Sequence, residues 1–246
     1  MADKQDILEL KNLSVEVEGK QILSDVNLRM RSGETHVLFG PNGSGKTTLL
    51  MAIMGFPRYK VTAGSVKLLG EDISSMHTDE RAKRGIGIMF QRPPTVQGVS
   101  LEQMITISSH DDVNAMALAE EMNLGGFLER DVNSGFSGGE IKRSELLQLM
   151  AQGPEVALLD EPESGVDMEN LHLVGKAIRV LLQKDLHRQR TNCGLIITHT
   201  GYILDFVEAD VGHVLSKGSI VCSGNPREQL EGIRRYGFEE CSKCTR

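Results

Sequence analysis

The chain has 246 residues, of which 39% are hydrophobic and 25% charged, a balance typical of one globular domain or of one domain with an inserted subdomain. Its formal net charge of -7 argues against a nucleic-acid partner, because affinity for a phosphate backbone depends on clustered Lys and Arg. No apolar run approaches the ~18–20 residues of a membrane-spanning helix, and the N-terminus lacks the apolar core of a secretory signal, so we expect a cytoplasmic protein without direct membrane insertion.

Short apolar runs bounded by glycines fill the beginning of the chain and predict β-strands. The predicted strands cover residues 7–12, 13–19, 25–30, 35–40, 64–70 and 85–90. A helix is predicted after Gly45, and it should end at Gly55 and Pro57, which stop helices.

Between residues 92 and 153 the strand patterns disappear, and helical patterns replace them. Ser137, with Glu140 three residues later, resembles a capping box and so predicts a helix that begins at the serine. Strands resume at residues 155–160, 194–198 and in a hairpin over 212–224. The sequence therefore predicts a single α/β domain, residues 1–246, with a core of residues 1–91 and 154–246 and an all-helical subdomain of residues 92–153.

The segment Gly40 to Thr47 reads GPNGSGKT and fits the phosphate-loop pattern G-x-x-x-x-G-K-[ST], between a predicted strand and a predicted helix. Glycines allow backbone N–H groups to face phosphate oxygens, and a helix N-terminus adds a positive dipole end. Lys46 is expected to reach the β- and γ-phosphates, and the Thr47 hydroxyl to bind Mg²⁺. The predicted nucleotide-binding residues are Gly40, Pro41, Asn42, Gly43, Ser44, Gly45, Lys46, Thr47 and Thr48.

The segment Val156 to Pro162 reads VALLDEP, an apolar strand that ends in two adjacent carboxylates. Ionised groups at the end of a buried strand are costly to desolvate unless they face a ligand. In a chain with a phosphate loop, we expect Asp160 to hold the Mg²⁺ shell and Glu161 to polarise the attacking water.

The SGGE segment, Ser137 to Glu140, lies about 20 residues before the acidic strand, and this order of motifs resembles the ABC ATPase family, whose signature is usually written LSGGQ. Gln91 resembles the family's Q-loop residue, the segment SGVD from Ser164 to Asp167 its D-loop, and His199 its switch histidine. The resemblance covers essentially the whole chain.

This resemblance implies a P-loop fold with a RecA-like core, an antiparallel β subdomain and an inserted helical subdomain. It implies ATP and Mg²⁺ as ligands, a catalytic set of Glu161, His199, Lys46 and Gln91, and Gln91 as a further metal contact. It also implies ATP-dependent homodimerisation, in which Ser137, Gly138, Gly139 and Asp167 act on the nucleotide held by the other subunit. The family's usual adenine-stacking aromatic is absent, because its matching position is Val17, so base recognition is expected to be loose.

The signature region RDVNSGFSGGEIKRSELLQLM is similar to that of SufC, the ATPase subfamily of the Suf iron–sulfur cluster assembly system. There a Phe precedes SGGE, a basic pair follows, and the helix continues with a Glu and an LQ. The similarity implies a SufB-like scaffold as partner, with a SufD-like protein as a second candidate, and we expect docking between Arg92 and Glu102. Pro162-Glu163 departs from the subfamily pattern. The alternative functions are a transporter's nucleotide-binding subunit and, with less support, a DNA-repair or translation ATPase.

The chain has four cysteines, which are expected to be reduced. Cys193 and Cys222 lie at the edges of predicted strands and are expected to be core residues. Cys241 and Cys244 have metal-ligand spacing, but a single C-x-x-C supplies only two of the about four ligands that zinc or a cluster needs. These two residues belong either to a tail with incidental thiols or to a site that a dimer mate or partner completes.

Overall fold

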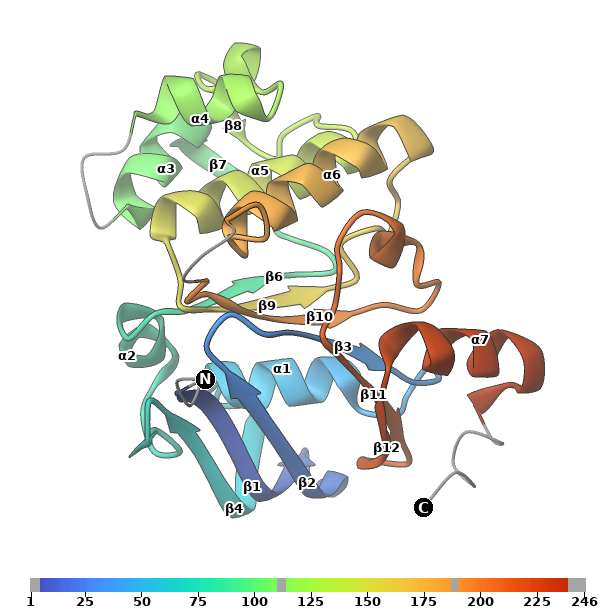
Figure 1. Cartoon of the computed structure of the whole chain (residues 1–246). Coiled ribbons are helices and arrows are strands. Elements are labelled where there is room, and N and C mark those ends of the chain that lie inside the picture. Colours follow the sequence, from blue (N-terminus) through green and yellow to red (C-terminus); the bar gives the residue numbers. More distant parts are fainter. Residues whose placement is uncertain (1–4, 110–113, 187–189, 239–246) are drawn as a thin grey trace.

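The computed structural model describes residues 5–109, 114–186 and 190–238 (Figure 1). A six-stranded sheet lies at its centre, with the strand order β12-β11-β3-β10-β9-β6. All neighbouring strands of this sheet are parallel except β12, which pairs antiparallel with β11. Its strands are β3 (Thr35–Phe39), β6 (Ile86–Met89), β9 (Val156–Asp160), β10 (Cys193–Ile197), β11 (Val211–Ser216) and β12 (Ser219–Gly224).

The central sheet separates two hydrophobic cores, because successive side chains of a strand point to opposite faces. In β9, Val156 and Leu158 belong to one core, and Ala157 and Leu159 belong to the other. All five residues of β9 are buried, as expected for a parallel strand covered on both faces.

The first core is closed by a four-stranded antiparallel sheet with the order β2-β1-β4-β5 and by helix α1 (Figure 1). The strands are β1 (Asp6–Val17), β2 (Lys20–Arg31), β4 (Tyr59–Leu68) and β5 (Glu71–Asp72), and α1 covers Lys46–Met54. The prediction of two separate strands over residues 7–19 was wrong. β1 is continuous, with its register shifted between Leu10 and Leu13, where Asn12 adopts a φ of 49°.

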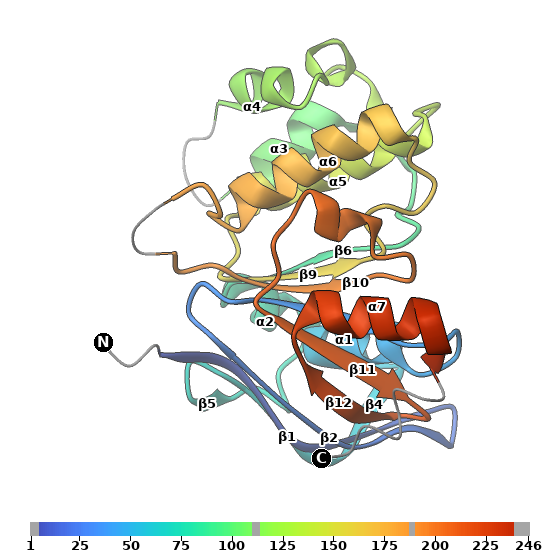
Figure 2. The ribbon, with the colours of Figure 1, turned by 45° about the vertical axis from the view of Figure 1, so that its right-hand side comes forward.

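The second core lies under the helices on the opposite face of the sheet (Figures 1 and 2). These helices are α3 (Leu101–Ser108), α4 (Ala115–Glu121), α5 (Gly138–Gln152) and α6 (Met168–Leu181), with a short 3₁₀ turn at Gly125–Phe127. The remaining elements are α2 (Thr78–Lys83), the 3₁₀ turn Tyr202–Asp205 and α7 (Pro226–Tyr236), which contacts β11.

The segment 92–153 is not all-helical, which corrects the prediction. β7 (Val96–Ser100) and β8 (Asp131–Val132) form a two-stranded antiparallel sheet within it. Two residues are too few to show a period-two pattern, and Gly98 interrupts the apolar alternation of β7, so neither strand was visible in the sequence. The helices predicted around this pair are present.

Within the described ranges, no helix is both long and apolar enough to cross a bilayer, and no cluster of three His, Cys, Asp or Glu side chains is arranged to hold a metal. Cys193 is fully buried, as predicted, and Cys222 is half-buried against the core. The predicted pair Cys241 and Cys244 lies outside the described residues.

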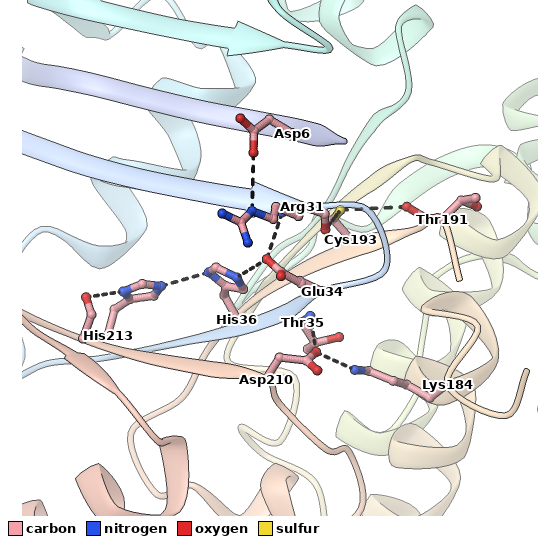
Figure 3. Close-up of polar contacts among 11 residues, drawn as sticks. Asp6, Arg31, Glu34, Thr35, His36, Lys184, Thr191, Cys193, Asp210 and His213 are labelled. Atoms are coloured by element: carbon pink, nitrogen blue, oxygen red, sulfur yellow. Dashed lines mark hydrogen bonds and ion pairs between the residues drawn. The ribbon is translucent and has the colours of Figure 1, made fainter. Parts of the chain in front are cut away.

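A chain of polar contacts runs through the buried sheet from Glu34 to Ser223 (Figure 3). His36 Nε2 lies 3.2 Å from Glu34 Oε2, His36 Nδ1 lies 2.9 Å from His213 Nε2, and His213 Nδ1 lies 2.7 Å from Ser223 Oγ. A carboxylate only accepts, so His36 donates to Glu34. With both rings neutral, His213 then donates to His36, and the Ser223 hydroxyl donates to His213. Burial lowers the pKa of both histidines, that of His213 to about 3, so both rings are neutral.

Candidate functional site

The predicted phosphate loop connects β3 to α1, as the sequence indicated. Gly43 and Gly45 adopt φ values of 76° and 106°, which side chains other than glycine rarely tolerate. A Cβ on Gly45 would also lie 2.6 Å from Leu23 Cδ2. The loop therefore needs these glycines in order to turn its backbone N–H groups toward the start of α1, where Gly45 is the N-cap.

The Lys46 ammonium folds back over the loop. Its Nζ donates to the carbonyl oxygens of Gly40 at 2.9 Å and Pro41 at 3.0 Å. Burial lowers the pKa of Lys46, and the nearby carboxylates of Glu161 and Asp160 oppose this shift. The lysine is thus held at the mouth of the loop, where it can exchange two carbonyl contacts for phosphate oxygens.

Thr47 and Asp160 come together across α1 and β9. The Thr47 hydroxyl donates to Asp160 Oδ2 at 2.9 Å, and Asp160 Oδ1 is buried with no hydrogen-bond partner in the described part of the chain. Burial raises the pKa of Asp160, a shift that a bound cation would oppose. A hydroxyl and a carboxylate are hard oxygen ligands, so this pair fits Mg²⁺.

Glu161 lies between Gln91 and His199. Its Oε2 accepts from Gln91 Nε2 at 2.5 Å, and its Oε1 lies 2.5 Å from His199 Nε2. Burial lowers the pKa of His199, and the positive charge of Lys46 lowers it further. The structure thus brings together three predicted catalytic residues that lie far apart in the sequence, and it places Gln91 on Glu161 rather than on Asp160.

These residues surround a cavity of about 610 Å³, a volume in the range of small-molecule sites. Among the described residues that line it there is no Phe, Tyr or Trp, and Val17 is not one of them. At Val17 the β1 strand instead pairs with Lys20 and Tyr59. Ile22, which the sequence did not single out, supplies an apolar wall. The cavity is lined by Ile22, Asn42, Gly43, Gly45, Lys46, Thr47, Thr48, Gln91, Glu161 and His199.

Gly40, Pro41 and Ser44 of the predicted loop do not line this cavity, and Ser137, Gly138, Gly139 and Asp167 form a second cluster away from it. Ser137 caps α5 in the predicted capping box, accepting from Glu140 N at 3.4 Å. A Cβ on Gly138 would lie 2.3 Å from Gly165 O, so the signature segment packs closely against the segment 164–167. Asp167 caps α6, and its side chain accepts from Asn170 N at 2.9 Å.

Two buried residues of α5 that sequence reasoning missed hold the strand end before Gln91. Lys142 Nζ donates to the carbonyl oxygens of Phe90 at 2.8 Å and Gln91 at 2.9 Å, while Glu145 Oε1 accepts from Phe90 N at 3.0 Å. Both side chains are nearly inaccessible to solvent, which is rare for charged residues without a structural role. Their presence on a helix beside a buried strand was the only signal in the sequence.

Comparisons with known proteins agree with this geometry. A sequence model of the family described as ABC transporter matches residues 23–164. The chain belongs to the ABC family of ATPases. Vegetative protein 296 of Bacillus subtilis is 41% identical to this ABC ATPase over 94% of the chain and 92% of its own length. The probable ATP-dependent transporter slr0075 of Synechocystis is 38% identical, over 96% of the chain and 95% of its own length.

Solved structures show the same fold. A nucleotide-free ATP-binding cassette of an ABC transporter superposes with a TM-score of 0.79 at 23% identity, covering 96% of this ABC ATPase and 98% of that chain. An Atm1-family exporter with ATP bound gives a TM-score of 0.78 at 18% identity, covering 98% of this chain and 42% of the exporter. As an ABC ATPase domain, the protein binds ATP with Mg²⁺ and hydrolyses it. Domains of this family dimerise with ATP and work with partner subunits.

Proposed function

We propose that hydrolysis is an in-line attack of water on the γ-phosphate of ATP in the cavity around Lys46. Glu161 polarises the water, because its carboxylate lies at the centre of the cavity's polar contacts, held by Gln91 and His199. His199 holds the γ-phosphate geometry, and its lowered pKa favours a neutral ring. Lys46 neutralises charge that develops on the phosphate oxygens.

Thr47 and Asp160 would hold Mg²⁺, with Gln91 as a further contact. When bound, the ion neutralises phosphate charge and orients the β- and γ-phosphates. Without the ion, the Thr47 hydroxyl donates to Asp160 and keeps its carboxylate oriented toward the loop. No Phe, Tyr or Trp in the described part of the chain lines the cavity, so binding depends on the phosphates more than on the base.

Two copies of the chain complete each site in this proposal. Ser137, Gly138, Gly139 and Asp167 lie outside the cavity of their own chain, in a separate cluster. A serine hydroxyl and a glycine-rich helix start suit an anion, and in this proposal they meet the phosphate held by a second copy.

We further propose that the protein drives conformational change of a SufB-type scaffold in iron–sulfur cluster assembly. Lys142 and Glu145 carry this proposal. They belong to the part of the signature region that resembles SufC, and they hold Phe90 and Gln91 at the entry to the segment where we expect the scaffold to dock. A partner that displaces this segment would therefore also displace Gln91 and, through its hydrogen bond, Glu161.

The docking segment between Arg92 and Glu102 borders a cavity of about 230 Å³. Its lining includes the apolar residues Pro93, Pro94, Val96, Met104 and Leu149 and the polar residues Ser108, Asn133, Glu145, Gln148 and Gln152. A hollow of this mixed lining, next to the residues that contact Gln91, suits the insertion of both apolar and polar side chains of a partner.

A transporter subunit is the second candidate. Relatives that are about 40% identical bear the name probable ABC transporter ATP-binding protein in Streptococcus pyogenes, and the family model carries the description ABC transporter. In that case the same hollow would receive a loop of a membrane subunit.

The test is purification of the tagged chain from its own cells without oxygen, followed by mass spectrometry and iron analysis of what accompanies it. A soluble, iron-containing SufB-like partner is the expected result. A polytopic membrane protein in its place would refute the scaffold proposal and support the transporter alternative.

Docking is tested separately with Pro93→Asp and Val99→Asp, which should abolish capture of the partner. Leu69→Asp is the matched control, because Leu69 is exposed in the antiparallel sheet subdomain and its positive φ suits aspartate. Unchanged capture by both docking variants would overturn the placement.

A further inference from the structure

Glu163, which together with Pro162 departs from the subfamily pattern, contacts the segment that carries the switch histidine. Glu163 Oε1 accepts from the hydroxyl of Thr198 and, at 3.2 Å, from the hydroxyl of Thr200. These two threonines flank His199 on either side, so a single carboxylate oxygen fixes the backbone before and after the histidine.

Further hydrogen bonds hold the segment 198–201 together and connect it to α7. The Thr198 hydroxyl also accepts from Gly201 N at 2.8 Å, and Thr198 is fully buried. Thr200 O accepts from Arg234 of α7 at 3.1 Å. The Glu163 carboxylate joins this unit to β9, whose C-terminal end carries Asp160 and leads directly into Glu161.

Glu163 also begins the turn that leads to the signature cluster. Its carbonyl oxygen accepts from Val166 N at 3.3 Å. Gly165, one of the two central residues of this turn, packs against Gly138. The same residue therefore contacts the histidine segment through its side chain and the segment 164–167 through its backbone.

We propose that Glu163 is the positioning residue of His199, and that it transmits displacement of residues 164–167 to the switch histidine. The inference rests on the proposed role of His199 in hydrolysis. In a dimer, the segment 164–167 lies beside the signature cluster that would meet the second copy's nucleotide, so occupancy of one site would influence the histidine of the other.

The surroundings of the Glu163 carboxyl indicate that it positions His199 and does not itself contact the nucleotide. Glu163 Oε2 is buried and has no hydrogen-bond partner in the part of the chain that the structure describes, and Glu163 does not line the nucleotide cavity. Burial raises its pKa, although the two threonine hydroxyls oppose this shift. The hydrogen bonds from the two threonines need only an acceptor oxygen, which the amide of a glutamine also supplies.

The experiment compares ATP hydrolysis by the full chain and by six variants. Glu163→Ala should lower kcat by about 10- to 100-fold, because displacement of a catalytic group by about 1 Å costs this much, with KM and nucleotide affinity unchanged. Glu163→Gln should recover most of the rate, since its amide oxygen still accepts. Thr200→Val, at an exposed position, removes the contact with Glu163 and a 3.3 Å hydrogen bond from Tyr202 N, and it should lower kcat by a smaller factor.

Two further measurements decide the outcome. The double variant Glu163→Ala/Thr200→Val should be no slower than Glu163→Ala, because Thr200 is expected to affect His199 through its contact with Glu163, which Glu163→Ala already removes. Glu129→Ala, at an exposed glutamate before β8, is the matched control and should hydrolyse ATP at the wild-type rate. A wild-type kcat in Glu163→Ala would overturn the inference, as would a Glu163→Ala effect confined to KM.

His199→Ala separates this inference from the function on which it rests. If His199→Ala abolishes turnover while Glu163→Ala does not change it, the positioning role alone is wrong. If His199→Ala leaves turnover unchanged, the proposed role of the histidine fails, and with it the role of Glu163.

Discussion

Glu145→Gln should change how the stability of the protein depends on pH. Burial raises the pKa of Glu145 from 4.5 to about 7, against the opposing effects of Phe90 N and Lys142. Between these pH values the folded protein retains a proton that the unfolded chain releases, so the free energy of unfolding falls as the pH rises. From the two pKa values, the raised pKa of Glu145 lowers the free energy of unfolding by about 1.4 kcal/mol at pH 5.5 and by about 3.4 kcal/mol at pH 8. Both figures are relative to low pH, where the carboxyl is protonated in the folded and the unfolded chain.

The glutamine removes this cost at both pH values, and its amide oxygen still accepts from Phe90 N. The change in side chain has its own effect on stability, which does not depend on pH. Relative to wild type, the variant should therefore gain about 2 kcal/mol of unfolding free energy on going from pH 5.5 to pH 8. Urea unfolding at the two pH values measures this difference.

Parallel pH dependences of the two proteins, within about 0.5 kcal/mol, would show that Glu145 ionises freely in the folded state. The burial of its carboxyl would then not determine its protonation. Glu129→Gln serves as the control for the change from carboxyl to amide, because Glu129 is exposed and lies outside α5.

Three other predictions concern the site and the sheet. Glu161→Gln should retain nucleotide binding, lower turnover by at least about 10²-fold and accumulate an ATP-bound dimer in sedimentation analysis, and normal turnover would exclude Glu161 as the water-polarising residue. Gly138→Ala should block dimerisation while nucleotide still binds the monomer, because the added Cβ would lie 2.3 Å from Gly165 O, and a dimer of wild-type affinity would contradict this. Wild type should lose about 2 kcal/mol of stability from His213 between pH 7 and pH 5, since the unfolded chain binds a proton there that the folded ring, with a pKa of about 3, refuses. His213→Gln should lack this loss in urea unfolding, and an equal loss in both proteins would exclude His213 as its source.

The sequence predicted the parts of the site that are continuous in the chain. The phosphate loop, the strand that ends in Asp160 and Glu161, and the capping box at Ser137 each depend on neighbouring residues, and the structure has the loop, the strand and the cap where they were expected. Local patterns determine such features because turn conformation, strand burial and helix capping act over a few residues.

The contacts among distant residues could not be predicted in this way. Lys142 and Glu145 look like ordinary charged positions of a helix, and only the packing of α5 against β6 shows that they bind the backbone of Phe90 and Gln91. Glu163 likewise reaches Thr198 only because β9 and β10 are neighbours in the sheet. Strand order is a property of the whole fold, and no residue pattern in this single sequence encodes it.

The two-sided burial of the central sheet limits which changes of length the chain can accept. A deletion of one residue within β9 would move Leu158 to the opposite core and turn Asp160 away from Thr47, because side chains alternate between faces. The same holds for β3 and β10, which end beside the phosphate loop and His199. We therefore expect no insertions or deletions within these three strands, even at positions that accept single substitutions. Length variation among relatives should fall in the connections that lie away from the C-terminal ends of the strands.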